Sequence, residues 1–261
     1  MRLAVVQTNP IFGEVETNIR NAISLMEQES ADLYVLPELF NTGYNFIDAD
    51  EVHHLAEPAD GKTSRSLGAF ARKTATYVVY GFAEKDGALY NSAGLVGPNG
   101  TIAVYRKVHL YFRETLFFAA GNLGFPVFEL PFGKVGVMIC FDWIYPESAR
   151  SLALRGAQLI AHPSNLVLPH CPDAMITRCL ENRVFAATAN RIGAEDRGGL
   201  KLQYIGRSEI VSPRGEILKS FGTDDVGVKV AEVDLAAASS KRINEFNDLL
   251  AGRRTDQYFP G

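Results

Sequence analysis

Strand-like and helix-like segments alternate along this chain from about Val5 to residue 235, and this alternation constrains its fold most strongly. Residues 134–139 form a β-branched, apolar run typical of a buried strand, whereas residues 17–29 carry apolar side chains at helical spacing. Between residues 77 and 105, Asp-Gly and Asn-Gly pairs separate three strand-like runs, which predicts antiparallel hairpins. No linker rich in Pro, Gly or Ser divides the chain. We therefore expect an α/β fold with mixed sheets covered by helices, in one domain spanning residues 1–261.

Charge and cysteine content argue against other classes of protein. The 26 basic and 30 acidic residues give a net charge of −4, and no run of Lys and Arg dominates a segment, so nucleic acid is not an expected partner. No apolar stretch reaches membrane-spanning length, and the four apolar residues near the N-terminus are too few for a signal peptide, which predicts a cytoplasmic protein without membrane contact. The three cysteines, an odd number without close pairing, predict neither a disulfide framework nor a metal site.

Three predicted strands are each followed by a side chain that can take part in catalysis, namely Glu38, Lys107 and Cys140. Ligands of α/β proteins collect beyond the carboxyl ends of strands, so these side chains are expected to converge. A cysteine nucleophile, a glutamate base and a lysine for a developing oxyanion form a complete catalytic set. Cys140 precedes a predicted helix over residues 145–156, whose N-terminal partial charge favours the thiolate. The alternative for Cys140 is a small buried core residue.

These segments resemble the three motifs of the nitrilase superfamily of carbon–nitrogen hydrolases, whose hallmark is a Glu–Lys–Cys triad. The motifs stand here as LPELF at residues 36–40, YRKVHL at 105–110 and GVMICFDWIYPE at 136–147. They occur in order, with triad members separated by 69 and 33 positions, and the resemblance covers nearly the whole chain. It is closest to the compact members that act on small aliphatic amides and nitriles. The resemblance implies a four-layer α-β-β-α sandwich and chemistry without a metal or organic cofactor.

The resemblance also implies roles for individual residues. Glu38 is expected to accept the proton of Cys140, and Lys107 to stabilise the oxyanion together with a backbone N–H. Glu114 matches a second glutamate that positions the substrate or orients the lysine in many relatives. The alternative is that Glu114 is a loop carboxylate paired with its neighbour Arg113.

Four further residues are expected to contact the substrate, although core packing is an equal alternative for Tyr44 and Trp143. They are Tyr44, Phe141, Trp143 and Asn165, where Phe141 offers the backbone N–H to the oxyanion. The predicted activity is hydrolysis of a small linear amide through a cysteine thioester. Hydrolysis of a small aliphatic nitrile or of an N-carbamoyl amine is an alternative within the same class. A catalytically idle, ligand-binding member of the fold is the alternative from a different class.

The C-terminal stretch, residues 240–261, is polar but carries scattered large apolar side chains such as Phe246 and Leu250. Such a tail packs either on its own domain or on a partner subunit. Proteins similar to this one dimerise through helices near the nucleophile, with tails that cross between subunits. We therefore expect a homodimer or a higher homo-oligomer.

Overall fold

Two six-stranded sheets form the centre of the computed structural model, which describes residues 1–258. The first sheet has the order β14-β1-β2-β3-β4-β5. Its strands β1, β2 and β3 run parallel, and β4, β5 and β14 are added by antiparallel pairing. The bounds of these strands are β1 Arg2–Gln7, β2 Leu33–Val35, β3 Tyr77–Asp86, β4 Ala88–Gly97, β5 Gly100–Arg106 and β14 Gly227–Glu232.

The second sheet has the order β13-β12-β9-β8-β7-β6, with β7, β8 and β9 parallel at its centre. A separate two-stranded antiparallel ribbon, β10 paired with β11, lies near the end of the first sheet. The bounds are β6 Val127–Leu130, β7 Gly133–Val137, β8 Leu159–Pro163, β9 Phe185–Ala189, β10 Ala194–Arg197, β11 Leu200–Gln203, β12 Glu209–Val211 and β13 Ile217–Ser220.

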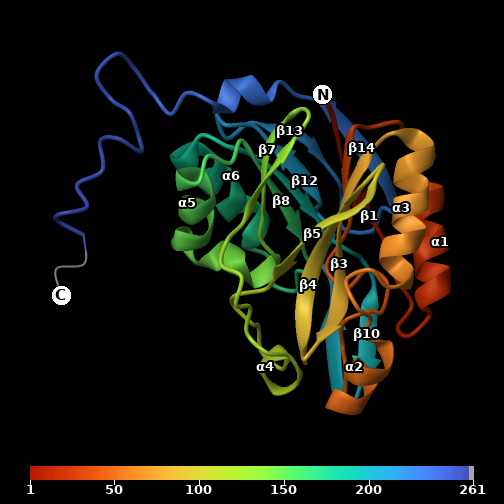
Figure 1. Ribbon diagram of the computed structural model, residues 1–261. Helices are drawn as coiled ribbons and strands as arrows, with labels where there is room; N and C mark the ends of the chain where they lie inside the picture. Colours follow the sequence, from red (N-terminus) through yellow and green to blue (C-terminus); the bar gives the residue numbers. More distant parts are fainter. Residues whose placement is uncertain (259–261) are drawn as a thin grey trace.

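Helices cover the outer faces of both sheets (Figure 1). Helices α1 (Val15–Met26) and α3 (Lys62–Thr74) cover the first sheet, and α5 (Pro146–Leu154) and α6 (Cys171–Asn182) cover the second. The short helices α2 (Ala49–Leu55) and α4 (Glu114–Phe117) lie together at one end, and η1 (Cys140–Ile144) and η2 (Leu235–Ala238) are 3-10 turns. This arrangement confirms the predicted four-layer α-β-β-α sandwich. Within residues 1–258, no helix has the length and apolar character needed to cross a bilayer.

The core fills the space between the two sheets. In β1, Leu3 and Val5 face the second sheet, whereas the alternate residues Ala4 and Val6 pack with the helices on the outer face. Strands that are covered on both faces have to be apolar at every position, which explains the continuous apolar runs in the sequence. At about 25 cal/mol per Å² of apolar surface removed from water, this two-sided burial is the main stabilising contribution.

Strand directions bring the predicted catalytic residues to one edge of the molecule. Strand β5 is antiparallel to β4, and β4 is antiparallel to β3, so β5 runs in the same direction as β2 and β3. The residues that follow β2 and β5 therefore leave the first sheet at the same edge. This edge carries the candidate active site.

Candidate active site

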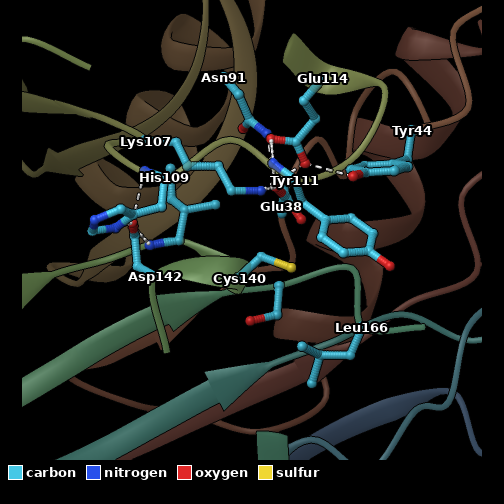
Figure 2. Close-up of polar contacts among 12 residues, drawn as sticks. Glu38, Tyr44, Asn91, Lys107, His109, Tyr111, Glu114, Cys140, Asp142 and Leu166 are labelled. Carbon is cyan, nitrogen blue, oxygen red and sulfur yellow. Dashed lines mark hydrogen bonds and ion pairs between the residues drawn. The ribbon is translucent and has the colours of Figure 1, made fainter. Parts of the chain in front are cut away.

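A buried lysine joins two glutamates at this edge (Figure 2). The Nζ atom of Lys107 lies 2.6 Å from Oε1 of Glu38 and 2.7 Å from Oε1 of Glu114. Lys107 directly follows β5, Glu38 stands in the turn after β2, and Glu114 begins α4. All three side chains are almost completely removed from solvent. The structure thus brings Glu38 to a lysine 69 positions later in the sequence, and Glu114 contacts Lys107 rather than Arg113.

The position of Glu38 is fixed by two neighbouring strands. The Gly81 N–H in β3 donates to the carbonyl of Pro37 at 3.1 Å, and a Cβ at Gly81 would come within 2.4 Å of the Glu38 Cα. Asn91 in β4 donates from Nδ2 to Oε1 of Glu38 at 2.7 Å, and its carbonyl accepts the Lys107 N–H at 2.8 Å. Asn91 therefore aligns both members of the ion pair. Sequence reasoning missed this residue, although a buried Asn within an apolar strand was a signal.

The second carboxylate oxygen of Glu38 has no hydrogen-bond partner. Its Oε2 atom is buried without a donor among residues 1–258. Figure 2 shows the sulfur of Cys140 directed toward the group formed by Glu38 and Lys107. Buried polar atoms are nearly always paired, so a free carboxylate lone pair beside a thiol is the arrangement that a proton acceptor needs.

Cys140 occupies an uncommon backbone conformation at the start of η1. Its φ angle is +40°, in the left-handed region that non-glycine residues rarely adopt and that is found at functional sites. A His162 ring nitrogen, Nε2, lies 3.0 Å from the Cys140 carbonyl oxygen. The buried Asp142 carboxylate accepts the Ile139 N–H at 2.9 Å, which fixes the residue before Cys140. The chain is thereby held in a sharp turn that presents the thiol.

Asp142 also links the cysteine segment to the lysine segment. Its carboxylate accepts the Tyr105 hydroxyl at 2.6 Å and the backbone N–H of His109 at 3.1 Å. The Nδ1 atom of His109 lies 2.8 Å from the same carboxylate. Tyr105 and His109 flank Lys107 in the sequence, so one buried carboxylate holds both catalytic segments in register.

Burial and the paired carboxylates determine the charges in this site. Burial alone would lower the pKa of Lys107, but the negative charges of Glu114 and Glu38 outweigh burial and raise this pKa above its ordinary value. The side chain therefore stays an ammonium ion. Burial raises the pKa of Glu114 to about 7, with Lys107 opposing the shift and Glu38 adding to it. Burial, reinforced by Glu38, raises the pKa of the Cys140 thiol well above its usual range despite Lys107. Cys140 therefore rests as a thiol and loses its proton during attack, the step in which Glu38 is expected to be the acceptor.

A narrow pocket opens beside the thiol, with a free volume of about 20 Å³. Apart from Cys140, its lining consists of uncharged residues: Tyr111, Phe141, Trp143, Asn165, Leu166, Val167 and Leu168. Both polar atoms of the buried Asn165 side chain lack a partner among the described residues. An uncharged amide that can both donate and accept a hydrogen bond thus stands against an otherwise apolar wall.

The structure separates the four predicted substrate contacts into two groups. Phe141, Trp143 and Asn165 line the pocket with Cys140. Tyr44 instead lies against Glu114, and its hydroxyl donates to Oε1 of that glutamate at 2.5 Å. Sequence reasoning also missed Tyr111, which lines the pocket and whose N–H donates to Oε2 of Glu114 at 3.2 Å.

Known proteins match this chain along almost its full length. A family model described as carbon-nitrogen hydrolase matches residues 2–243. A protein from Pyrococcus abyssi named nitrilase is 51% identical over 99% of both chains. An (R)-stereoselective amidase from a Pseudomonas species is 33% identical over 98% of this chain and 95% of the relative.

Solved structures agree with the sequence comparisons. A carbon-nitrogen hydrolase from Helicobacter pylori matches with a TM-score of 0.90 and 26% identity, over 99% of this chain and 97% of the other. An amidase from a Nesterenkonia species matches with a TM-score of 0.81 and 26% identity, over 98% of this chain and 94% of the other. In one structure of that amidase, the acetamide moiety of fluoroacetamide is added covalently to its active-site cysteine. From the family match, the relatives and the shared fold, the chain belongs to the carbon–nitrogen hydrolase family, the nitrilase superfamily, and is a hydrolase.

Proposed function

We propose that the protein hydrolyses the carbon–nitrogen bond of a small linear amide and releases ammonia and a carboxylic acid through a thioester at Cys140. One observation carries the proposal. The ammonium of Lys107 is held between two buried carboxylates beside the thiol, and Oε2 of Glu38 remains free to accept a proton. A protein that only binds its ligand has no need for this base and cation.

The first half-reaction forms the thioester. Glu38 accepts the thiol proton through Oε2 while Sγ of Cys140 attacks the amide carbon and the carbonyl electron pair moves onto oxygen. The Lys107 ammonium and the backbone N–H of Phe141 stabilise this oxyanion, since N–H groups in the first turn of a helix have no partner within the helix. The carbon–nitrogen bond then breaks, the nitrogen takes the proton from Glu38, and ammonia leaves.

The second half-reaction releases the acid. Water gives a proton to Glu38 and attacks the thioester carbon, and the same two donors stabilise the second oxyanion. The carbon–sulfur bond breaks, the sulfur recovers the proton from Glu38, and the carboxylic acid departs. Neither half-reaction has a step that requires a metal ion. Among residues 1–258, no group of three or more His, Cys, Asp and Glu side chains could hold one.

The pocket favours uncharged acyl groups. Its walls beyond Cys140 carry no ionisable acid or base other than the Tyr111 phenol. A carboxylate or ammonium on the acyl chain would lose its hydration without gaining a counter-ion there, at a cost of several kcal/mol. The free amide of Asn165 is suited to a neutral polar group of the substrate.

A nitrile is the second candidate substrate, favoured by the 51% identity to the protein named nitrilase. Attack on a nitrile gives a thioimidate, and addition of water to it leads through a tetrahedral adduct to the same thioester. An N-carbamoyl amine is a third candidate, since a tomato relative named N-carbamoylputrescine amidase is 32% identical over 88% of this chain.

Ammonia release from propionamide, fumaronitrile and N-carbamoylputrescine tests the proposal. Mass spectrometry of the enzyme after mixing with a panel of amides would reveal the mass of the acyl group on Cys140. We expect an adduct with amides, and no adduct or ammonia with Cys140→Ser. Absence of ammonia from the whole panel, together with a thiol that does not react with iodoacetamide, would favour an idle ligand-binding protein.

We further propose that residues 1–261 form one domain whose tail, residues 240–261, packs on a partner subunit in a homodimer. Residues 259–261 of this tail lie outside the described residues. After η2 the chain extends away from the sheets on the side of α5 and α6 (Figure 1). Phe246 in this segment is 84% exposed, and Ile144 and Leu180 are exposed on the same side of the sandwich. Sedimentation at micromolar concentration should show a dimer, and Phe246→Asp should weaken it.

A cytoplasmic location is proposed as well. The three cysteines are all free, and the mechanism requires that Cys140 stay reduced. Reducing compartments preserve such thiols.

A further inference from the structure

A buried carboxylate outside the triad accepts hydrogen bonds from the backbone of residues 44–45, a few positions after Glu38. Glu195, in β10, accepts the Asn45 N–H at 2.7 Å and the Tyr44 N–H at 3.1 Å through Oε2. The same oxygen accepts the hydroxyl of Tyr204 at 3.1 Å. A carboxylate that accepts several hydrogen bonds in a buried site holds its donors in a fixed geometry.

An arginine neutralises this carboxylate. Arg191 donates from Nη1 to Oε1 of Glu195, and the two side chains are 1% and 5% exposed. The guanidinium also donates to the Pro10 carbonyl at 3.1 Å and stacks over the ring of Tyr204, with 4.1 Å to the ring centroid. A buried ion pair contributes little net stability after desolvation, so its presence calls for a role in specifying geometry.

The turn that receives Glu195 is shaped for it. Gly43 has a φ angle of +82°, and a Cβ there would come within 2.8 Å of Oε1 of Glu195. The Gly43 N–H donates to the carbonyl of Leu39 at 3.0 Å, directly after Glu38. Gly43 therefore permits the close approach that fixes residues 43–45.

Tyr44 carries this fixation into the active site. Its hydroxyl donates to Oε1 of Glu114 at 2.5 Å, the same oxygen that accepts from Lys107. Burial and then the charge of Glu114 raise the pKa of Tyr44 well above its ordinary value, so the hydroxyl keeps its proton and acts as the donor. Figure 2 shows Tyr44 and Lys107 approaching Glu114 from different sides.

We propose that the Arg191–Glu195 ion pair is a positioning element of the active site, which fixes the backbone at Tyr44 so that its hydroxyl keeps the Glu114 carboxylate ionised beside Lys107. The inference rests on the proposed function, because it concerns the charge that the reaction uses. The titratable groups around Glu114 are Lys107 after β5, Glu38 after β2, Cys140 in η1, Tyr44 in its turn and Tyr111 before α4.

Tyr44→Phe tests the last contact of this chain. The hydrogen bond from Tyr44 lowers the pKa of Glu114, which burial raises to about 7, so its removal raises that pKa further. Loss of a hydrogen bond to a charged carboxylate raises its pKa by about one unit. The acid limb of kcat/KM should therefore move to higher pH by about one unit. At pH 7 the ionised fraction of Glu114 then falls from about a half to about a tenth. Activity should fall about fivefold at pH 7 and stay nearly unchanged at pH 9.

Glu195→Gln tests the Arg191–Glu195 ion pair. The variant loses the negative charge, and its amide nitrogen cannot accept hydrogen bonds from the backbone N–H groups of Tyr44 and Asn45. We expect a shift of the acid limb in the same direction, and no further shift in the double variant with Tyr44→Phe. Glu51→Gln is the matched control: it removes the ion pair that Glu51 of α2 makes with Arg197 of β10, 2.6 Å away and beside the same turn, but leaves the hydrogen bonds of Tyr44 to Glu195 and Glu114 in place. This control should leave the pH profile unchanged.

The outcomes separate the inference from the proposed function. Equal losses at every pH in Glu195→Gln, or additive shifts in the double variant, would overturn the positioning role while the enzyme remained an amidase. If the wild type released no ammonia from any substrate, the proposed function would fail. The pH dependence of iodoacetamide alkylation at Cys140 would then still test the positioning role: an alkylation profile unchanged in both variants would reject it.

Discussion

The buried His162 beneath Cys140 should make the stability of the enzyme depend strongly on pH. Burial lowers the pKa of His162 to about 4, whereas an unfolded histidine titrates near about 6.5. Because the folded pKa is depressed, the unfolded chain binds more protons between these values. The stability that comes from a neutral His162 is therefore complete above about pH 6.5 and is lost as the pH falls toward about 4.

The size of this loss follows from the two pKa values. A difference of about 2.5 units corresponds to about 3 kcal/mol, of which about 2 kcal/mol is lost by pH 5. His162→Gln keeps a donor for the Cys140 carbonyl but does not titrate. At pH 7.5 the variant should be less stable by about 1–2 kcal/mol, because it loses the contact between Nδ1 and the Thr188 hydroxyl at 3.1 Å and some packing.

Urea unfolding of both proteins between pH 7.5 and 4.5 measures this effect. The stability advantage of the wild type should shrink and then reverse as the pH falls, since only the wild type has to protonate His162 on unfolding. His54→Gln, on the exposed side of α2, serves as a control and should follow the wild type at every pH. A gap between wild type and His162→Gln that stays constant across the range would refute the reasoning.

Two other substitutions test what holds the site together, and a third tests a buried carboxylate elsewhere in the second sheet. Gly81→Ala should destabilise the protein by about 3 kcal/mol and impair activity, because the new Cβ would overlap the Glu38 backbone at 2.4 Å; urea unfolding and kcat/KM measure both effects. Asp142→Asn places an NH₂ group against buried donors, so it should cost about 3 kcal/mol and lower kcat at least tenfold, whereas an unchanged kcat would contradict its role in holding Cys140. Burial raises the pKa of Glu209 to about 8, so stability is lost as the pH rises from about 4.3 through 8; Glu209→Gln should add about 3 kcal/mol at pH 8.5 and much less at pH 5, as thermal melts would show.

Local patterns were sufficient to predict an α/β fold with mixed sheets and the three strand ends, whereas the four-layer sandwich was predicted from the family resemblance. Strands such as β1 and β7 are apolar because both of their faces are covered. Lys107 directly follows β5, and Glu38 and Cys140 stand shortly after β2 and β7. The ribbon of β10 and β11 was missed because AEDR and LKLQ lack the β-branched residues that mark a strand. Helix α2 was also missed, although Asp48 signals its start by accepting the Glu51 N–H at 2.9 Å.

The supporting residues were harder to predict because their roles arise from distant segments. Asn91 matters only because β4 lies between β3 and β5, where it reaches both Glu38 and Lys107. Glu195 matters only because the ribbon returns to the turn at Tyr44. The proton on the resting Cys140 thiol also depends on its surroundings, since a short 3-10 turn, not the α-helix itself, begins at the thiol and burial outweighs the partial charge of the turn.

The hydrogen bonds already made by the two carboxylates assign them different tasks. Oε1 of Glu38 accepts from Asn91 and Lys107, but its Oε2 accepts from no described residue and keeps both lone pairs. Oε1 of Glu114 accepts from Lys107 and Tyr44, and its Oε2 already accepts from the Tyr111 N–H. Glu38 is therefore the carboxylate with room for the thiol proton, whereas Glu114 is committed to holding the ammonium.

This division predicts different kinetic losses for the two isosteric substitutions. Glu38→Gln should abolish acylation of Cys140, because the other carboxylate of the site, Glu114, already accepts hydrogen bonds at both of its oxygens. Glu114→Gln should still form the acyl-enzyme, but more slowly, because Lys107 keeps one of its two anionic partners. Mass spectrometry of the adduct after rapid mixing with an amide distinguishes the two variants. Rapid acylation in Glu38→Gln would show that the proton goes elsewhere and that acceptor capacity does not assign the base.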